Sequence, residues 1–239
     1  MLGNLGKYLV RLKFSPRTQE LLYRYLAWRE LREALDQLQI NCVLDVGANR
    51  GQFAVGLRKI GFRGWIISFE PSPDDFAVMK TALQADPFWR GHQIALGAED
   101  TTCDFNITLG DTRMSSMLHL RREGAQVKVV PVQVKRLDQV LDSVLEGIEQ
   151  PRVFLKMDTQ GFDLKVIQGA SGCVERMLGL LSEISAEPSY DNMPGYMESL
   201  KTYEDLGFRL KGVSEIAWNR RRGTLVEMDC LMIRPLAST

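Results

Sequence analysis

Acidic residues lie at the carboxyl ends of three apolar runs in this sequence. Asp45 is the fourth residue of CVLDV, Glu70 directly follows WIISF, and Asp158 directly follows VFLKM. If these runs form parallel strands, their carboxyl ends meet at one edge of a sheet, and ligands of such proteins bind outside that edge. The three acids therefore predict a single site, where they could attract a cation, accept hydrogen bonds or remove a proton.

The segment DVGANRG, which begins at Asp45, indicates the kind of ligand. A dinucleotide-binding loop also joins the first strand to a helix, but its three glycines let the backbone approach a pyrophosphate. Here Asn49 replaces the second glycine, and Asp45 would repel a pyrophosphate or raise its own pKa. S-adenosylmethionine (SAM) resolves this conflict because it carries an ammonium group, a sulfonium group and no phosphate. We therefore expect SAM here, with Asp45 attracting its amino-acid end.

Glu70 indicates that the ligand contains adenosine. An acid at the end of the second strand can accept hydrogen bonds from both ribose hydroxyls. Dinucleotide and SAM sites both use such an acid, and an acid there can instead cap the next helix, which Ser72 and Pro73 begin. Residues 95–97 lie at the end of the predicted third strand. Their backbone groups either line a pocket for adenine or form an ordinary connection from the strand to the next loop.

Apolar runs alternate with helical patterns along the chain, which indicates an α/β protein with a parallel sheet and crossover helices. The predicted strands are residues 42–46, 65–69, 94–96, 153–157 and 178–184, then a hairpin of 208–213 and 230–233. The predicted helices are 52–60, 73–85, 137–145, 163–168 and 195–206. A helical extension, residues 1–39, precedes a domain of residues 40–239. Between about 101 and 134 the period changes to two, which predicts an antiparallel insertion.

The composition argues against several classes of partner. The 30 Lys and Arg residues balance the 30 Asp and Glu residues, so no net field attracts nucleic acid or an anionic membrane. The four Cys residues include no C-x-x-C pair, which argues against zinc sites and disulfide frameworks. No apolar run approaches the ~20 residues of a membrane span, so we expect a cytoplasmic protein. Leu2, Leu5, Leu9 and Leu12 have helical spacing, which suits packing on protein or, less commonly, docking on a membrane.

Several motifs, in this order, resemble the FkbM family of SAM-dependent methyltransferases: VLDVGANRGQF, FEPS, IALG, VFLKMDTQGFDLKVIQGA and SEISAEPSY. The resemblance implies the class I methyltransferase fold, a Rossmann-like doubly wound sheet of seven strands with the last one antiparallel. It implies methyl transfer to hydroxyl groups of sugars, glycans, glycolipids or polyketides. Family members often have glutamate where this chain has Gln160. The resemblance places the contacts of the first loop on Asp45, Gly47, Asn49 and Gly51, and the ribose contact on Glu70. The other cofactor contacts that we expect are Phe53, Pro71, Ser72, Ala95, Leu96, Gly97 and Asp158.

Methyl transfer to an alcohol needs an aligned acceptor and a group that takes its proton. Asp158 is the first candidate for this base; Glu183 at the end of the fifth strand and His119 in the insertion are further candidates. Asp158, Glu183 and Glu187 could alternatively hold Mg²⁺, although the preferred site contains no metal. No Asn-Pro-Pro-Tyr follows the fourth strand, which argues against methylation of amines.

Two other functions are compatible with parts of this pattern. A nicotinamide-dependent oxidoreductase would explain Glu70 but not the combination of Asp45 and Asn49. A SAM-binding protein without transfer activity would keep the whole cofactor site. The preferred prediction is an O-methyltransferase that acts on a hydroxylated small molecule or a glycan. The sequence determines neither the acceptor nor the oligomeric state.

Overall fold

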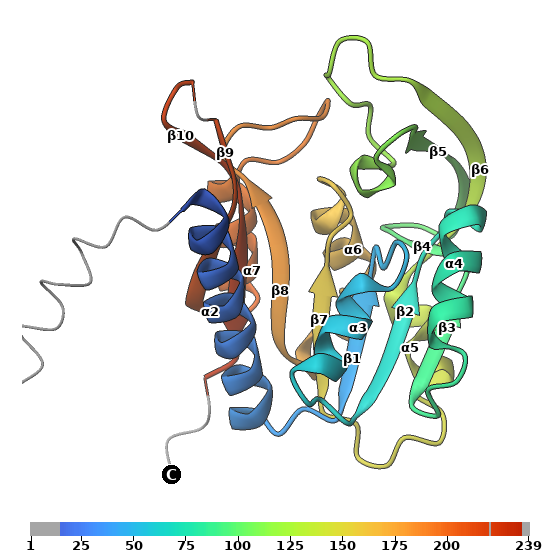
Figure 1. Cartoon of the computed structure of the whole chain (residues 1–239). Coiled ribbons are helices and arrows are strands. Elements are labelled where there is room, and N and C mark those ends of the chain that lie inside the picture. The colour runs from blue at the N-terminus through green and yellow to red at the C-terminus, as the bar shows by residue number, and fades with distance from the viewer. Residues whose placement is uncertain (1–14, 220, 236–239) are drawn as a thin grey trace, which may run out of the picture.

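The computed structural model describes residues 15–219 and 221–235 and contains a central sheet between two layers of helices (Figure 1). Seven strands form this sheet in the order β3-β2-β1-β7-β8-β10-β9. β10 is antiparallel to both of its neighbours, whereas the pairs among the first five strands are parallel. The predicted doubly wound sheet with a reversed last strand is therefore confirmed. The strands are β1 (Cys42–Val46), β2 (Trp65–Phe69), β3 (Trp89–His92), β7 (Val153–Met157), β8 (Met177–Ser185), β9 (Arg209–Asn219) and β10 (Thr224–Ile233).

Helices cover both faces of the sheet and enclose two separate cores. Residues of α2, α3 and α4 pack on one face, against Val43 and Phe154. Residues of α5, α6 and α7 pack on the other face, against Leu44 and Leu155. Alternate residues of β1 and β7 thus point into opposite cores, as expected for strands buried on both faces. The helices are α2 (Pro16–Gln37), α3 (Gln52–Lys59), α4 (Pro73–Leu83), α5 (Leu137–Val144), α6 (Asp163–Gly169) and α7 (Tyr196–Asp205), with the short 3₁₀ helices η1 (Thr112–Met114) and η2 (Val174–Arg176).

The predicted helical extension contains α2, which runs beside β9 at one edge of the sheet (Figure 1). Ser15 caps it by accepting a hydrogen bond from the backbone N–H of Thr18 at 3.2 Å. The second half of α2 is buried in the core, whereas residues 21–26 are exposed. The expected amphipathic segment with Leu2, Leu5, Leu9 and Leu12 lies outside the described residues. Within the described part of the chain, no helix is long and apolar enough to span a membrane.

The predicted position of the third strand is wrong. β3 is Trp89–His92, and the apolar run that suggested a strand at 94–96 supplies β4 (Ala95–Leu96) to a second, three-stranded sheet of order β4-β6-β5. β3 is an edge strand whose residues are all half-buried, so it carries no continuous apolar run. β5 (Thr101–Thr108) and β6 (Val127–Lys135) pair antiparallel, as the insertion was expected to do.

Candidate active site

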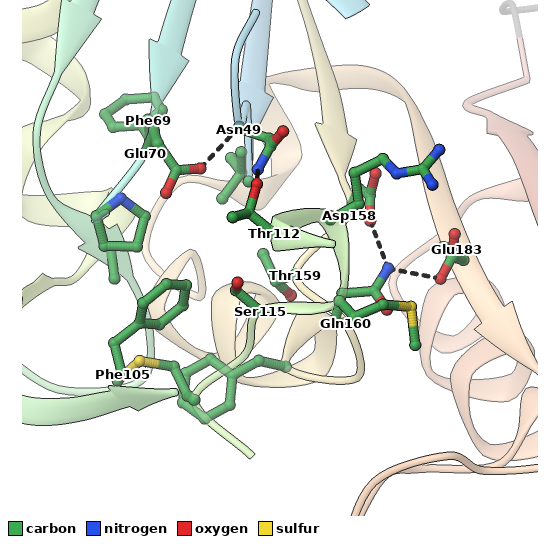
Figure 2. A pocket seen from close by; sticks show the side chains of 18 of the residues that line it. Asn49, Phe69, Glu70, Phe105, Thr112, Ser115, Asp158, Thr159, Gln160 and Glu183 are labelled. Atoms are coloured by element: carbon green, nitrogen blue, oxygen red, sulfur yellow. Dashed lines mark hydrogen bonds between the residues drawn. The ribbon is translucent and has the colours of Figure 1, made fainter. Parts of the chain in front are cut away.

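A pocket of about 350 Å³ opens at the carboxyl ends of β1, β2, β7 and β8 (Figure 2). Its volume falls in the range of about 300–1,000 Å³ that is usual for small-molecule sites. Asn49 and Glu70 lie at one end, Asp158, Gln160 and Glu183 lie at the other, and part of the insertion covers the space between them. The lining residues that come from the insertion are Phe105, Asp111, Thr112, Arg113, Met114, Ser115 and Met117.

The loop after β1 reaches the pocket through left-handed backbone conformations. Gly47, Asn49 and Gly51 have φ angles of +72°, +48° and +81°. A Cβ atom on Gly47 would lie 2.0 Å from the carbonyl oxygen of Asp158, so only glycine lets this loop approach the end of β7. Gly47 and Asn49 line the pocket, whereas Gly51 caps α3 and packs on Leu83.

The structure corrects the role expected for Asp45. Its carboxylate is fully buried and lies 2.9 Å from Nζ of Lys156, its register partner on the neighbouring strand. Asp45 does not line the pocket, because its side chain points toward the core beneath α3. The positive charge that balances this carboxylate is therefore supplied by the chain itself.

Lys156 is a residue whose role the sequence-based reasoning missed. Its Nζ donates a hydrogen bond to the carbonyl oxygen of Gly47 at 3.1 Å and lies 3.8 Å from the carboxylate of Asp158. Burial alone would lower the pKa of Lys156, but the carboxylates of Asp45 and Asp158 outweigh burial and raise it. Lys156 thus joins the β1 loop to the end of β7. A lysine inside the apolar run VFLKM, at the same distance from the strand end as Asp45 in CVLDV, was the signal that could have revealed the pair.

Glu70 is almost fully buried at the end of β2 and faces the pocket (Figure 2). One carboxylate oxygen accepts the backbone N–H of Asn49 at 2.7 Å, and the other accepts the N–H of Ser72 at 2.8 Å. Burial raises the pKa of Glu70 to about 7, although both backbone hydrogen bonds lower it. Each oxygen keeps a lone pair, so the carboxylate can still accept hydrogen bonds from a ligand.

Three polar side chains are joined by hydrogen bonds at the other end of the pocket. Nε2 of Gln160 donates to Oδ1 of Asp158 and to Oε1 of Glu183, both at 2.9 Å (Figure 2). Burial and then the charges of Asp158 and Glu227 raise the pKa of Glu183 well above its usual value. Glu227, on β10, also lines this end of the pocket and was not predicted from the sequence. The structure therefore brings Asp158 and Glu183 together as predicted.

Asp163 holds the loop that carries Asp158 and Gln160. Its buried carboxylate accepts hydrogen bonds from the backbone N–H of Thr159 at 3.0 Å and from the hydroxyl of Ser182 at 2.6 Å. Burial raises the pKa of Asp163. These bonds tie the loop to β8 and α6, so the acidic end of the pocket is attached to rigid elements.

The insertion forms a roof that contacts both ends of the pocket. The hydroxyl of Thr112 accepts a hydrogen bond from Nδ2 of Asn49 at 3.0 Å and donates to Oδ1 of Asp75 at 3.1 Å. Farther along, the hydroxyl of Ser116 donates to the backbone oxygen of Gln160 at 2.9 Å. The roof is therefore fastened to the β1 loop and to the loop after β7.

Several other predicted residues lie beside the pocket or away from it. Pro71, Ala95 and Leu96 line the pocket, whereas Phe53, Ser72, Gly97 and His119 do not. Phe53 stacks on Trp28 of α2, Ser72 caps α4, and a Cβ on Gly97 would meet Val134. The backbone oxygen of His119 accepts the N–H of Asp191 in a neighbouring loop.

The carboxylates that were considered as magnesium ligands are not gathered at one point. Glu187 is engaged at the terminal hairpin, where its Oε1 accepts a hydrogen bond from the hydroxyl of Thr224 at 2.5 Å. Among the residues that the structure describes, no group of three or more His, Cys, Asp or Glu side chains is arranged to hold a metal ion. The observed side chains do not fit the Mg²⁺ alternative.

Comparisons with known proteins concern the fold and the family of this chain. No curated protein matches the chain. The magnesium protoporphyrin IX methyltransferase of Synechocystis PCC 6803, solved with SAM bound, aligns with a TM-score of 0.50 and 8% identity, over 91% of this chain and 80% of that one. Fibrillarin of Aeropyrum pernix with bound SAM gives 0.43 and 15%, over 80% and 66%. An rRNA methylase of Streptococcus thermophilus gives 0.47 and 10%, over 87% and 94%.

The likeness to the magnesium protoporphyrin IX methyltransferase concerns the fold, and the order and direction of the strands are those of the class I SAM-dependent methyltransferases. The sequence itself is more specific. Residues 45–210 match the family model described as the methyltransferase FkbM domain, and they include the β1 loop, Glu70, the insertion and the loop after β7. The chain belongs to the FkbM methyltransferase family.

Proposed function

We propose that this protein transfers a methyl group from SAM to a hydroxyl group of a sugar, a glycan, a glycolipid or a polyketide-type molecule. The observation that carries the proposal is the division of the pocket into two unlike ends. One end presents the backbone of a glycine loop and the carboxylate of Glu70, and the other presents the carboxylates of Asp158 and Glu183.

The first end suits the adenosyl half of SAM. Glu70 is fixed by two backbone hydrogen bonds and can accept bonds from ribose hydroxyls. Gly47 and Asn49 present the loop backbone to the pocket beside it. Arg113, a cation among the pocket-lining residues, is paired with Asp111, and Lys156 is paired with Asp45. Family membership also favours methyl transfer over the nicotinamide-dependent alternative.

The second end suits an alcohol that must lose a proton. SAM supplies an electrophilic methyl group; the acceptor oxygen bonds to it while the carbon–sulfur bond breaks and its electron pair stays on sulfur. Asp158 lies at the carboxyl end of β7, and its side chain is 42% exposed in the pocket. It is therefore placed to orient the acceptor hydroxyl and take its proton. The sequence contains no Asn-Pro-Pro-Tyr, so an amine acceptor has less support.

The test uses SAM with a labelled methyl group and a panel of hydroxylated glycans, glycolipids and polyketides. We expect label on an acceptor oxygen, located by mass spectrometry and NMR. Asp158→Asn keeps the size of the side chain and should reduce turnover by roughly 100- to 10,000-fold while SAM binding is retained. Transfer to nitrogen, or unchanged turnover in Asp158→Asn, would contradict the proposal.

The non-catalytic alternative has its own outcome in the same experiment. Tight binding of SAM, measured by calorimetry, without transfer to any acceptor of the panel would favour a SAM-binding protein. A chain that binds NADH and not SAM would favour the oxidoreductase. EDTA should leave the transfer rate unchanged, because the described carboxylates form no metal site.

A further inference from the structure

Gln160 lies where the floor and the roof of the pocket meet, and the mechanism described above leaves its side chain without a role. We propose that Gln160 is a positioning residue for methyl transfer, whose amide joins Asp158 and Glu183 into one hydrogen-bonded pair that receives the acceptor. The inference rests on the proposed function, since it concerns the same site.

The contacts of Gln160 fix both ends of its amide group. The amide nitrogen donates one hydrogen bond to Asp158 and one to Glu183, so both of its protons are used. Because both partners are carboxylates, which accept hydrogen bonds, the nitrogen rather than the oxygen must face them. The amide oxygen lies 2.9 Å from the hydroxyl of the fully buried Tyr190, which is also 2.9 Å from the backbone oxygen of Met114. Tyr190 therefore links the amide of Gln160 to the roof of the pocket.

The backbone around Gln160 is held in an uncommon conformation. Gln160 has a φ angle of +53°, and Gly161 follows with +90°. A non-glycine residue in the left-handed region costs of order 1 kcal/mol and persists only where the surroundings impose it. Here the Ser116 hydroxyl donates to the Gln160 backbone oxygen, and a Cβ on Gly161 would lie 2.7 Å from Met193. These contacts hold Gln160 in the left-handed conformation, in which its side chain lies between the two carboxylates.

The two carboxyl groups that the amide joins have different roles in the proposed reaction. Two neighbouring carboxylates repel each other, so one of them tends to retain a proton. Each of the two Nε2 protons is donated to one oxygen of one carboxyl group. The second oxygen of each carboxyl group is left for the acceptor. Glu183, the more buried of the two, is the member that keeps the proton and can donate a hydrogen bond, whereas Asp158 accepts the proton of the reacting hydroxyl. An acceptor with two adjacent oxygens, as in a sugar ring, can engage both members.

The charges around the pair come from several elements. Burial first, and then the surrounding carboxylates, raise the pKa of Glu183. The titratable groups around the pair come from five parts of the fold. They are Asp163 on α6, Glu227 and Asp229 on β10, Lys156 on β7, Tyr190 in the loop after β8 and Arg113 on η1. Gln160 is the uncharged donor that touches both members of the pair.

The test compares Gln160→Glu, which has the same shape but lacks the amide donors, with Tyr190→Phe, which removes the hydroxyl that contacts the Gln160 amide oxygen and the Met114 backbone oxygen. ¹³C NMR of the side-chain carboxyl groups follows their titration in the absence of acceptor. We expect the titration of Glu183 to move upward by about one pH unit in Gln160→Glu, with a smaller shift in Tyr190→Phe. The acid limb of the pH profile of kcat/KM should move in the same direction, and kcat should fall roughly 10-fold or more.

Affinity for SAM should stay within about 2-fold in both variants, since Gln160 lies away from Glu70. Gln133→Glu, on the exposed side of β6, is the matched control and should change neither titration nor turnover. If Gln160→Glu does not fold, Gln160→Met removes the donors without adding a charge and decides by the same readouts. Unchanged titration and unchanged kcat would overturn the inference. A wild-type protein that transfers no methyl group to any hydroxyl acceptor would overturn the proposed function instead, because the NMR titration needs no turnover.

Discussion

At the scale of single residues, the site depends on charges that are buried and paired. The carboxylate of Asp45 and the ammonium of Lys156 neutralise each other between β1 and β7, and Lys156 extends from there to the Gly47 carbonyl. An isolated charge at such a depth would be strongly destabilising, so neither member is tolerated alone. The pair is a structural support for the β1 loop, the part of the pocket to which we assign cofactor binding.

Asp45→Asn should therefore act mainly on stability. It leaves the buried ammonium of Lys156 without its partner, which costs roughly 3–5 kcal/mol of unfolding free energy. Urea unfolding followed by circular dichroism measures the loss. The double variant Asp45→Leu with Lys156→Met replaces both charges and should recover most of it. Glu33→Gln, which breaks an exposed pair with Arg29 on α2, is the control and should show no measurable change. A stable Asp45→Asn protein would contradict this account.

Glu70 gives a second prediction, for the pH dependence of cofactor binding. Burial raises its pKa to about 7. Below that pH the group is protonated and loses its charge, so affinity for SAM should rise as the pH increases through about 7. Calorimetry at pH values about one unit below and above measures the change. Glu70→Gln should bind SAM roughly 10- to 100-fold more weakly, with a flat pH profile. Asp74→Asn, which removes an exposed acid of α4, should keep the wild-type profile.

At the scale of elements, the pocket is made where a parallel sheet and an antiparallel hairpin meet. The large sheet supplies the floor through the ends of β1, β2, β7 and β8, and the small sheet carries the roof (Figure 1). The hydroxyl of Thr112 connects these two parts, because it bonds to Asn49 in the β1 loop and to Asp75 of α4.

Thr112→Val tests that connection with almost no change in volume. The loss of the two hydrogen bonds should loosen the roof, and each such bond contributes about 1 kcal/mol. We expect KM for the acceptor to rise roughly 5-fold while kcat at saturation changes less. Steady-state kinetics measure both quantities. The same substitution at Thr102, an exposed residue of β5, should leave KM unchanged. Equal effects of the two substitutions would show that the roof does not act through Thr112.

The elements also show what the sequence could predict. The strands at 42–46, 65–69 and 153–157 were predicted with their observed ends, because central parallel strands are continuous apolar runs. β3 was missed, since WRGH at the sheet edge has no such run. The site could be predicted only in part. Asp158 and Glu183 lie at or near strand ends, and this position identified them in the sequence. The link through Gln160 depends on how two loops fold against each other, which periodicity does not report.

At the scale of the whole molecule, α2 belongs to the core of the catalytic unit. Leu31, Leu35 and Leu38 are buried with residues of α3 and α4, and Trp28 stacks on Phe53 at 5.3 Å between ring centroids. The first half of the same helix exposes large apolar side chains, including Leu22. The two halves should therefore respond differently to truncation.

Leu35→Ala should lower the unfolding free energy by roughly 2–5 kcal/mol, because it removes buried methyl groups and leaves a cavity. Leu22→Ala removes the same atoms from an exposed position, which is 44% accessible, and should change it by less than about 0.5 kcal/mol. Thermal unfolding of the two variants, measured side by side, checks this. Similar losses in both would mean that the first half of α2 is also packed.

The small sheet has a consequence for how this type of enzyme diversifies. The segment that contains its hairpin begins after β4 and ends before α5, and β4 pairs with the end of β6, so both ends of this segment of roughly forty residues are anchored on the same side of the scaffold. Recombination can exchange such a segment without changing the large sheet and the β1 loop, to which we assign the methyl donor. Relatives that share the β1 loop but differ between β5 and β6 should then use the same methyl donor and methylate different acceptors.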